Sequence, residues 1–337
     1  MGCQQERAKE AASILVMADM RGIYSHGVNR LPEYVALWKK KRITIPPEIS
    51  IVREGLATAL IDGGKAFGLV TAPYAMRLAI SKAKHTGAAW VSVRNSYHFG
   101  IAAYYAMMAL EHDMIGIAMT NANPLVAPTY SKKAALGTNP YAIAIPAFEE
   151  DAFVADMATA PINRGKLDEW DATGQTVPDG LVQDSKGITS NNAKVLSQKG
   201  AIKTLGIDKV HGGHKGYCLS ATVDILSAVL SGANFGPLVV PTLNYVENQF
   251  DAKDNGIGHL FGAIRIDAFQ EANVFKEYMD QWIRTFKSLP AVDGHRVLIP
   301  GEIERDNEQR QIREGIRLPE YVLEKLKMIS SQFDIAL

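Results

Sequence analysis

The sequence predicts an α/β fold, because short apolar runs with β-branched residues alternate with longer helical patterns. Residues 88–93 have the composition of a buried strand, and residues 101–110 are apolar and alanine-rich, which is typical of a buried helix. The same alternation recurs with a strand at 114–120 and a long apolar helix at 217–232. A chain of 337 residues is long enough for one large domain or two ordinary ones.

Composition and charge narrow the class of protein. The hydrophobic fraction of 47% and the charged fraction of 21% are ordinary for a globular chain. The 36 Lys and Arg residues balance the 36 Asp and Glu residues, so no overall field favours nucleic acid or an anionic membrane. Cys3 and Cys218 lie far apart, and no apolar run reaches the length of a membrane span. We therefore expect a cytoplasmic protein with neither a nucleic-acid nor a membrane partner.

The remaining elements follow from the same patterns, with proline and glycine marking the breaks. In the N-terminal part we expect, in order, a helix at 5–20, a break at 46–47, two strands within 49–61, a turn at 62–65 and a helix at 71–85. In the C-terminal part we expect strands at 141–146, 153–159 and 257–266, a charged helix from 164, a polar surface excursion at 171–208, and helices at 268–288 and within 301–337. The first helix begins so close to Met1 that we expect a further piece upstream.

His98 lies between the predicted strand 88–93 and the predicted helix 101–110. Open α/β sheets commonly place their chemistry where strands end. A neutral imidazole at such a turn can accept a proton from a substrate hydroxyl near pH 7. The alternative is a histidine that only caps the turn, and its position in the sequence does not decide between the two.

A second candidate group precedes the proline break. His26, Arg30 and Tyr34 are spaced by four residues, which places them on one face if the segment is helical. Ser25 adjoins them. Because a guanidinium group binds a carboxylate through two parallel hydrogen bonds, this set suits a small acid. The alternative is a surface arginine that pairs with a nearby glutamate.

Several well-known site motifs are missing from the sequence. It contains no Gly-x-Gly-x-x-Gly turn, P-loop, His-Glu-x-x-His, paired-cysteine or Gly-x-Ser-x-Gly pattern. A dinucleotide would therefore bind without the usual glycine fingerprint. Candidate ligand contacts are the polar loop at 121–124, which follows a predicted strand, and Lys215 in a glycine-rich stretch.

Six motifs in one order resemble the malate/L-lactate dehydrogenase family of the non-Rossmann type, which also holds ureidoglycolate and sulfolactate dehydrogenases. They are GIYSHGVNR (22–30), NSYHFG (95–100), GTNP (137–140), DMAT (156–159), GGHKG (212–216) and PGE (300–302). The resemblance implies a mixed-sheet, non-Rossmann dinucleotide-binding domain at 51–288. It also implies a helical domain built from both chain ends, 1–50 and 289–337, and a homodimer.

The resemblance further implies an activity and the residues that carry it. The activity is hydride transfer between NAD or NADP and a small 2-hydroxy or 2-oxo acid such as malate or lactate. His98 matches the catalytic proton acceptor. Ser25, His26 and Arg30 match substrate-binding positions, and Tyr34 is a weaker match. The cofactor-binding positions implied are Ala122, Asn123, Thr138, Asn139, Asp156, Met157, Ala158 and Lys215, with no metal.

The sequence departs from the family pattern in two motifs. Ser96-Tyr97-His98 has tyrosine where the family more often has asparagine or glycine, and residues 188–193 replace a usual Pro-Thr-Thr-Asp-Pro run. Other readings stay open within the family, namely ureidoglycolate or sulfolactate oxidation and reduction of a cyclic-imine acid. Outside it, the alternatives are a metal-dependent hydrolase with His26, His98 and His214 as ligands, and a binding protein without catalysis.

Overall fold

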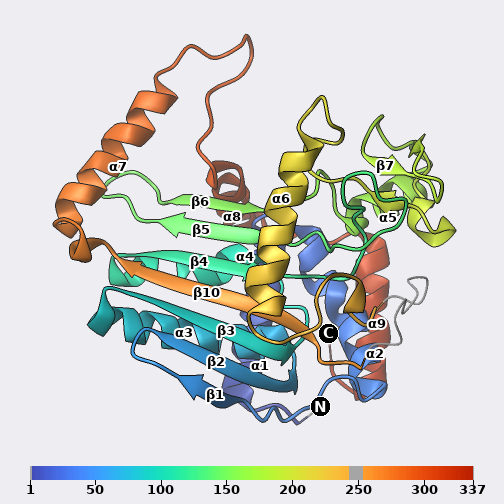
Figure 1. Cartoon of the computed structure of the whole chain (residues 1–337), viewed down its shortest axis with the longest axis horizontal. Helices are drawn as coiled ribbons and strands as arrows, with labels where there is room; N and C mark the ends of the chain where they lie inside the picture. The colour runs from blue at the N-terminus through green and yellow to red at the C-terminus, as the bar shows by residue number, and fades with distance from the viewer. Residues whose placement is uncertain (1, 243–252, 337) are drawn as a thin grey trace.

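A seven-stranded mixed sheet forms the centre of the protein, as the computed structural model of residues 2–242 and 253–336 shows (Figure 1). The strand order is β1-β2-β3-β10-β4-β5-β6, in which β2 and β3 are parallel and the other neighbours antiparallel. The strands are β1 (Ser50–Glu54), β2 (Thr58–Ala66), β3 (Ala88–Ser96), β4 (Met114–Thr120), β5 (Tyr141–Ile145), β6 (Phe153–Met157) and β10 (Ile257–Arg265). The predicted mixed α/β fold is confirmed.

Helices cover both faces of this sheet (Figure 1). On one face lie α3 (Gly68–Thr86) and α4 (Ala102–Met107), and on the other lies α6 (Gly213–Asp224), which continues as a π-helical stretch at Ile225–Val229. The prediction for 101–110 is too long, because α4 crosses β4 closely and the chain must turn back into that strand. A Cβ on Gly116 would lie 1.9 Å from the Ala106 carbonyl oxygen. None of the helices in the described ranges has the length and hydropathy to span a bilayer.

Helices from the two chain ends pack together, as the resemblance implies. The four are α1 (Gln5–Met20), α2 (Leu31–Lys39), α8 (Glu302–Glu314) and α9 (Glu320–Phe333), and α1 contacts α8 while α2 contacts α9. Ile14 and Leu37 belong to the same buried apolar cluster as Phe261 of the central sheet. The N-terminal helices therefore share their core with the sheet, and domain boundaries at 50 and 288 stay a prediction.

Two sequence predictions about irregular structure are wrong. The predicted turn at 62–65 lies inside β2, where Gly64 and Lys65 adopt positive φ and shift the register against β3. The predicted polar excursion at 171–208 follows α5 (Arg164–Thr173) and holds a second small sheet of β7 (Val182–Gln183), β8 (Thr189–Ser190) and β9 (Ala201–Ile202). It encloses an apolar cluster of its own around Leu167, Trp170 and Ile202.

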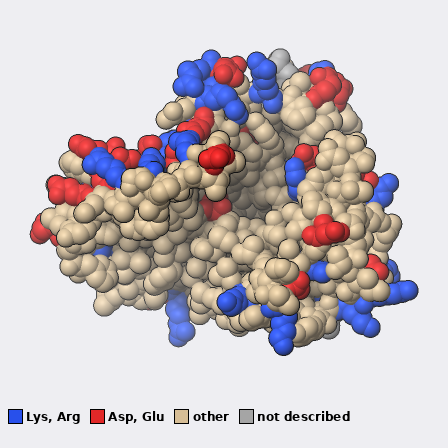
Figure 2. Space-filling model, turned by 90° about the horizontal axis from the view of Figure 1, so that it is seen from above, with Lys and Arg blue, Asp and Glu red and all other residues tan. Residues whose placement is uncertain are grey.

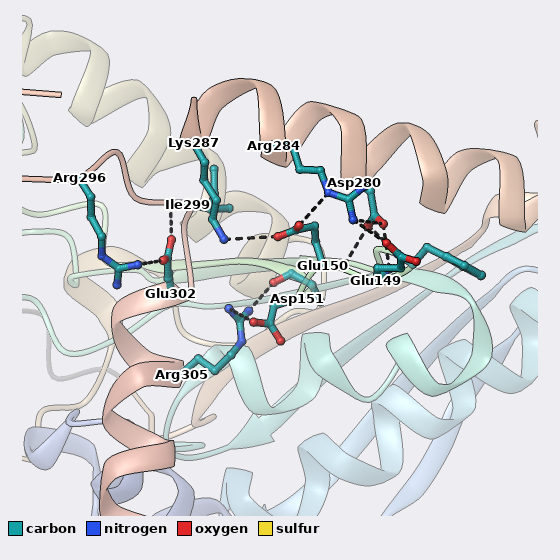
Figure 3. Close-up of polar contacts among 12 residues, drawn as sticks. Glu149, Glu150, Asp151, Asp280, Arg284, Lys287, Arg296, Ile299, Glu302 and Arg305 are labelled. Atoms are coloured by element: carbon teal, nitrogen blue, oxygen red, sulfur yellow. Dashed lines mark hydrogen bonds and ion pairs between the residues drawn. The ribbon is translucent and has the colours of Figure 1, made fainter. Parts of the chain in front are cut away.

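Polar contacts hold the hairpin between β5 and β6 from two sides (Figure 3). On α7 (Ala272–Lys287), the buried Asp280 carboxylate accepts the backbone N–H groups of Phe148, Glu149 and Glu150 at 2.9, 2.9 and 3.1 Å. On α8, Arg305 pairs with Asp151 at 3.0 Å. Because α7 and α8 fix this hairpin, they also fix the opposite ends of β5 and β6, where the candidate site lies.

The strand register brings five strand ends to one edge of the sheet. Ser96 at the end of β3 pairs with Ile257 at the start of β10. Thr120 at the end of β4 pairs with His259, and Tyr141 at the start of β5 pairs with Met157 at the end of β6. The residues that follow β3, β4 and β6 and those that precede β5 and β10 therefore meet at this edge. The sequence spreads these groups over most of the chain.

The segment between α1 and α2 is fixed against the buried carboxyl group of Asp19. The Val28 N–H donates to Asp19 Oδ2 at 2.9 Å, and a Cβ on Gly27 would lie 1.8 Å from Asp19 Oδ1. Burial raises the pKa of Asp19 to about 6, although the hydrogen bond from Val28 works in the opposite direction. Asp19 therefore positions the turn that carries Ser25, His26 and Arg30.

We expect Asp19→Asn to weaken the pH dependence of stability. The pKa of Asp19 is about 6 in the folded protein, above the reference value of 3.8, so folding favours the protonated carboxyl group. The stability gained from this preference is complete below pH 3.8 and is lost as the pH rises through about 6. The full change corresponds to about 3 kcal/mol in the free energy of unfolding. Urea denaturation between about pH 4 and 7 measures it, and the half-buried Asp156, whose pKa is also raised, should leave a residual slope. An Asn variant with the wild-type slope would contradict this account.

Candidate active site

The candidate site is a cavity at the sheet edge where the strand ends meet. Of the predicted site residues, its lining includes His26, Arg30, His98, Ala122, Asn123 and Thr138. The fold therefore joins the N-terminal segment to loops of the central sheet. On the face seen from above, Lys and Arg side chains are interspersed with Asp and Glu around a central hollow (Figure 2).

His98 follows β3 and precedes α4, as predicted. Its Nδ1 lies 2.6 Å from Tyr34 Oη, and the Gly100 N–H donates to the same nitrogen at 3.3 Å. Nε2 has no hydrogen-bond partner among the described residues, which leaves this nitrogen for a ligand. Burial lowers the pKa of His98 well below its usual value, and the charge of Arg30 lowers it further. The imidazole is therefore neutral at pH 7 and able to accept a proton.

His26 stacks on His98, with the ring centroids 5.3 Å apart. Its Nδ1 lies 2.9 Å from Ser25 Oγ, so Ser25 orients this ring from behind the cavity wall. Burial, followed by the charges of Arg30 and Arg164, lowers the pKa of His26 to about 3. Two neutral imidazole rings therefore lie side by side, within the electrostatic influence of the Arg30 and Arg164 guanidinium groups. The predicted helical face is replaced by two short 3-10 turns, Tyr24–His26 and Val28–Arg30, which Gly27 separates.

Arg30 pairs with Glu33 and also lines the cavity, so its ion pair does not prevent it from contacting a ligand. Its Nε donates to the Ser25 carbonyl oxygen at 2.7 Å, and its Nη1 donates to Glu33 Oε2 at 2.9 Å. Nη2 has no acceptor in the part of the chain that the structure describes. The guanidinium group therefore presents its Nη end to the cavity, while Nε fixes its plane.

Sequence reasoning missed Glu33 and Arg164, which also line the cavity. Glu33 Oε2 accepts a second hydrogen bond from Arg164 Nη2 at 3.3 Å, and Thr242 Oγ1 donates to Oε1 at 3.1 Å. Burial opposes the charge of Glu33, but Arg30 and Arg164 outweigh it and the pKa of this carboxyl group is lowered. The available signals were weak: Glu33 stands three residues after Arg30, and Arg164 follows the helix-capping Asn163.

The cofactor-binding positions implied by the resemblance divide into two sets. Ala122, Asn123 and Thr138 line the cavity. Met157 and Ala158 come next to this wall, because the Thr159 N–H donates to the Thr138 carbonyl oxygen at 2.9 Å. Ala122, Pro140 and Ile257 give this wall apolar surface. The Asn123 amide beside it is held by Thr242: Nδ2 donates to Thr242 Oγ1 at 2.8 Å, and Oδ1 accepts the Thr242 N–H at 3.2 Å.

Asn139, Asp156 and Lys215 lie outside the cavity lining, as Met157 and Ala158 also do. Asn139 is fully buried, and its Oδ1 accepts the Ala122 N–H at 3.1 Å. Asp156 Oδ2 accepts the Ala103 N–H at the start of α4, at 2.8 Å, and burial raises the pKa of Asp156 to about 6. Lys215 is exposed on the first turn of α6. Their binding roles stay predictions, while Asn139 and Asp156 have clear structural ones.

Tyr97, the residue that departs from the family pattern, belongs to a separate contact next to His98. Its hydroxyl donates to Asp254 Oδ2 at 2.6 Å, and Arg42 pairs with the same carboxylate at 2.9 Å. The guanidinium carbon of Arg42 lies 5.7 Å from the centroid of the Tyr97 ring. These contacts of Tyr97, Asp254 and Arg42 connect the segment after α2 to the residues just before β10, beside the cavity.

The hydrolase alternative requires a three-histidine ligand set, which the described residues do not form. His26 and His98 lie together, but His214 is exposed on α6. No group of three or more His, Cys, Asp or Glu side chains suited to a metal is present in the ranges 2–242 and 253–336.

Comparisons with known proteins identify the family of this chain. The malate/L-lactate dehydrogenase family model matches residues 1–327. The chain is 41% identical to a malate dehydrogenase of Pyrococcus abyssi, over 99% of this chain and 91% of the relative. It is 40% identical to a malate/(S)-sulfolactate dehydrogenase of Methanothermus fervidus, over 100% and 94%. The solved malate dehydrogenase of Entamoeba histolytica superposes with a TM-score of 0.92 at 35% identity, over 100% and 94%. The chain therefore belongs to the malate/L-lactate dehydrogenase family.

Proposed function

We propose that this chain is a nicotinamide-dependent 2-hydroxy acid dehydrogenase that uses NAD or NADP. The observation that carries the proposal is the neutral His98, whose Nε2 is left for a ligand, in one cavity with Arg30. A base beside a carboxylate receptor suits an acid whose hydroxyl stands next to the carboxylate. Relatives named for malate and sulfolactate support this class of substrate. We further propose that the protein works in the cytoplasm.

The protein's part in the reaction is to bind the acid and move one proton. Arg30 holds the C1 carboxylate, and His26 packs beside the reacting carbon. In the tautomer whose Nδ1–H donates to Tyr34 Oη, in place of accepting the long Gly100 N–H contact, His98 accepts the hydroxyl proton at Nε2, and protonated His98 returns it to the 2-oxo group in the reverse direction. A nicotinamide held beside Ala122, Asn123 and Thr138 would supply the acceptor for the C2 hydrogen and its electron pair. Burial keeps Tyr34 protonated by raising its pKa, so the phenol supports the base without replacing it.

The nicotinamide would lie against Ala122, Asn123 and Thr138, and the rest of the dinucleotide would extend toward Asp156, Met157 and Ala158. Asn139 would act by holding Ala122 in place, and Lys215 would meet a phosphate only at the outer end of such a path. This arrangement needs no glycine fingerprint, because open loops at strand ends form the surface.

His98→Ala should lower kcat by at least about a hundredfold, because general base catalysis contributes roughly 10²–10⁴. Cofactor affinity, measured by fluorescence titration, should stay nearly unchanged. In wild type, kcat/KM for oxidation, which reports the free enzyme, should not titrate near pH 6.5, since the pKa of His98 lies well below that value. A variant with near-normal kcat would contradict the assignment and make His26 the next candidate.

Arg30→Ala should raise KM for the acid by about ten- to a hundredfold, because a charged hydrogen bond contributes roughly 1.5–3 kcal/mol. Arg30→Lys should recover only part of this loss, since an ammonium group cannot also satisfy the Ser25 carbonyl oxygen and Glu33. Steady-state kinetics with malate, lactate, sulfolactate and ureidoglycolate and each cofactor provides the comparison, with thermal melts to check folding. An unchanged KM would place the carboxylate elsewhere.

We also propose that the chain forms a homodimer through the face of the sheet that α6 covers. The end of this helical segment exposes three apolar side chains, Ile225, Val229 and Leu230, which are 53%, 51% and 60% exposed. Exposed side chains of α7, among them Tyr278, line an apolar groove on the neighbouring β5 and β6. By contrast α4 packs into the core, where Tyr105 is fully buried, so it offers little surface for such contact.

Sedimentation should therefore give twice the mass of one chain, and Val229→Glu should shift the protein toward monomer, because a carboxylate is costly to bury in an apolar interface. Val210→Glu is the matched control, since Val210 is 90% exposed in an unrelated loop. A wild-type monomer with full activity on dilution would overturn the dimer. Equal behaviour of the two variants would overturn this choice of surface.

A further inference from the structure

Two guanidinium groups meet at a single carboxylate inside the cavity. Arg30 Nη1 and Arg164 Nη2 both donate to Glu33 Oε2, at 2.9 and 3.3 Å. Two donors that share one oxygen atom lie close enough for one small molecule to reach both side chains. The site described so far uses only Arg30.

The start of α5 is built to hold Arg164 at this position. Asn163 Oδ1 accepts the Lys166 N–H at 3.0 Å and so caps the helix, while its Nδ2 donates to Ser25 Oγ at 3.4 Å. A Cβ on Gly165 would lie 2.8 Å from the Ser25 Cβ, so glycine allows the helix to approach the Ser25 turn. Arg164 is therefore fixed beside the same turn that carries His26 and Arg30.

The two arginines contact Glu33 at different distances. Arg30 has its Nε tied to backbone at 2.7 Å, and its Nη1 contact to Glu33 is short. Arg164 reaches Glu33 only at 3.3 Å, and its Nε lies 3.6 Å from the exposed Asp168 carboxylate. Glu33 Oε2 is therefore shared by both guanidinium groups, with Arg30 the nearer donor.

The charge of Arg164 already acts at the reacting centre. It lowers the pKa of both His26 and His98, after the larger contribution of burial. Since both rings are neutral, the charged side chains among the described residues that line the cavity are Arg30, Arg164, Glu33 and Asp254, and Asp254 pairs with Arg42. A ligand with one carboxylate engages Arg30, and a second acid group on the same ligand would meet the cation at Arg164.

We propose that Arg164 determines substrate specificity by binding the second acid group, a carboxylate or sulfonate on C3, of a dianionic 2-hydroxy acid. The inference rests on the proposed function and deepens it. Arg30 takes the C1 carboxylate and His98 the hydroxyl, which leaves the C3 substituent directed to α5. A substrate with a methyl group there, such as lactate, gains nothing from Arg164.

Arg164→Met tests this assignment, because methionine keeps an unbranched side chain and loses the charge. We expect kcat/KM for malate to fall by about ten- to a hundredfold, and kcat/KM for lactate to change by less than about threefold. Arg164→Lys should restore part of the malate activity. Asp168→Asn is the control: it removes the exposed partner of Arg164 outside the cavity and should leave both substrates unaffected.

Equal losses for malate and lactate would show that Arg164 only supports the fold of the site, and no loss for malate would place the second acid group elsewhere. Either result overturns the inference while the dehydrogenase assignment stands. If wild type oxidises none of the acids, the proposed function fails instead. Calorimetric binding of malate and lactate to wild type and Arg164→Met then decides the role of Arg164, which requires a selective loss of malate affinity.

Discussion

The site depends on a clamp that joins three strand ends through the imidazole of His259. This ring is fully buried, with Nδ1 at 2.7 Å from Thr120 Oγ1 and Nε2 at 2.9 Å from Ser96 Oγ. Burial lowers its pKa to about 3, so it has one donor and one acceptor, which the two hydroxyl groups match. Loss of either hydroxyl group would leave a buried ring nitrogen of His259 without a hydrogen-bond partner, which would cost about 1–3 kcal/mol of stability. The clamp fixes the end of β3, two residues before His98, and the end of β4, before the loop at 121–124.

Local patterns predicted most of the fold because they depend on neighbouring residues. The strand at 114–120 has its predicted bounds, and α1 spans the predicted 5–20. The small sheet after α5 was hidden because its core needs few apolar side chains, and these are separated by polar residues. The continuation of β2 through residues 62–65 was missed because glycine and aspartate suggest a turn, whereas here they form an irregular strand.

The site was predictable where function requires a particular residue type, and less so where partners come from distant segments. His98, His26 and Arg30 converge as proposed, since their chemistry is visible in the sequence. Tyr34 orients the base through Nδ1, a role that spacing alone did not distinguish from substrate binding. Arg164 looked like an ordinary residue of a charged helix, because its meeting with Glu33 depends on how α5 packs. Asp156 looked like a ligand contact, yet its carboxylate accepts an N–H from α4.

The buried charges of the site explain why its histidines are neutral and why its arginines are not interchangeable. Protonating His98 or His26 would add a charge beside Arg30 in a desolvated cavity, so both pKa values are lowered. A substrate carboxylate reverses this balance, because it supplies negative charge where the proton must arrive. In the proposed mechanism, binding of the acid thus prepares His98 to accept the proton that the reaction releases. Arg30 can do this only while Ser25 and Glu33 fix its plane, so the geometry of one guanidinium group links substrate binding to proton transfer.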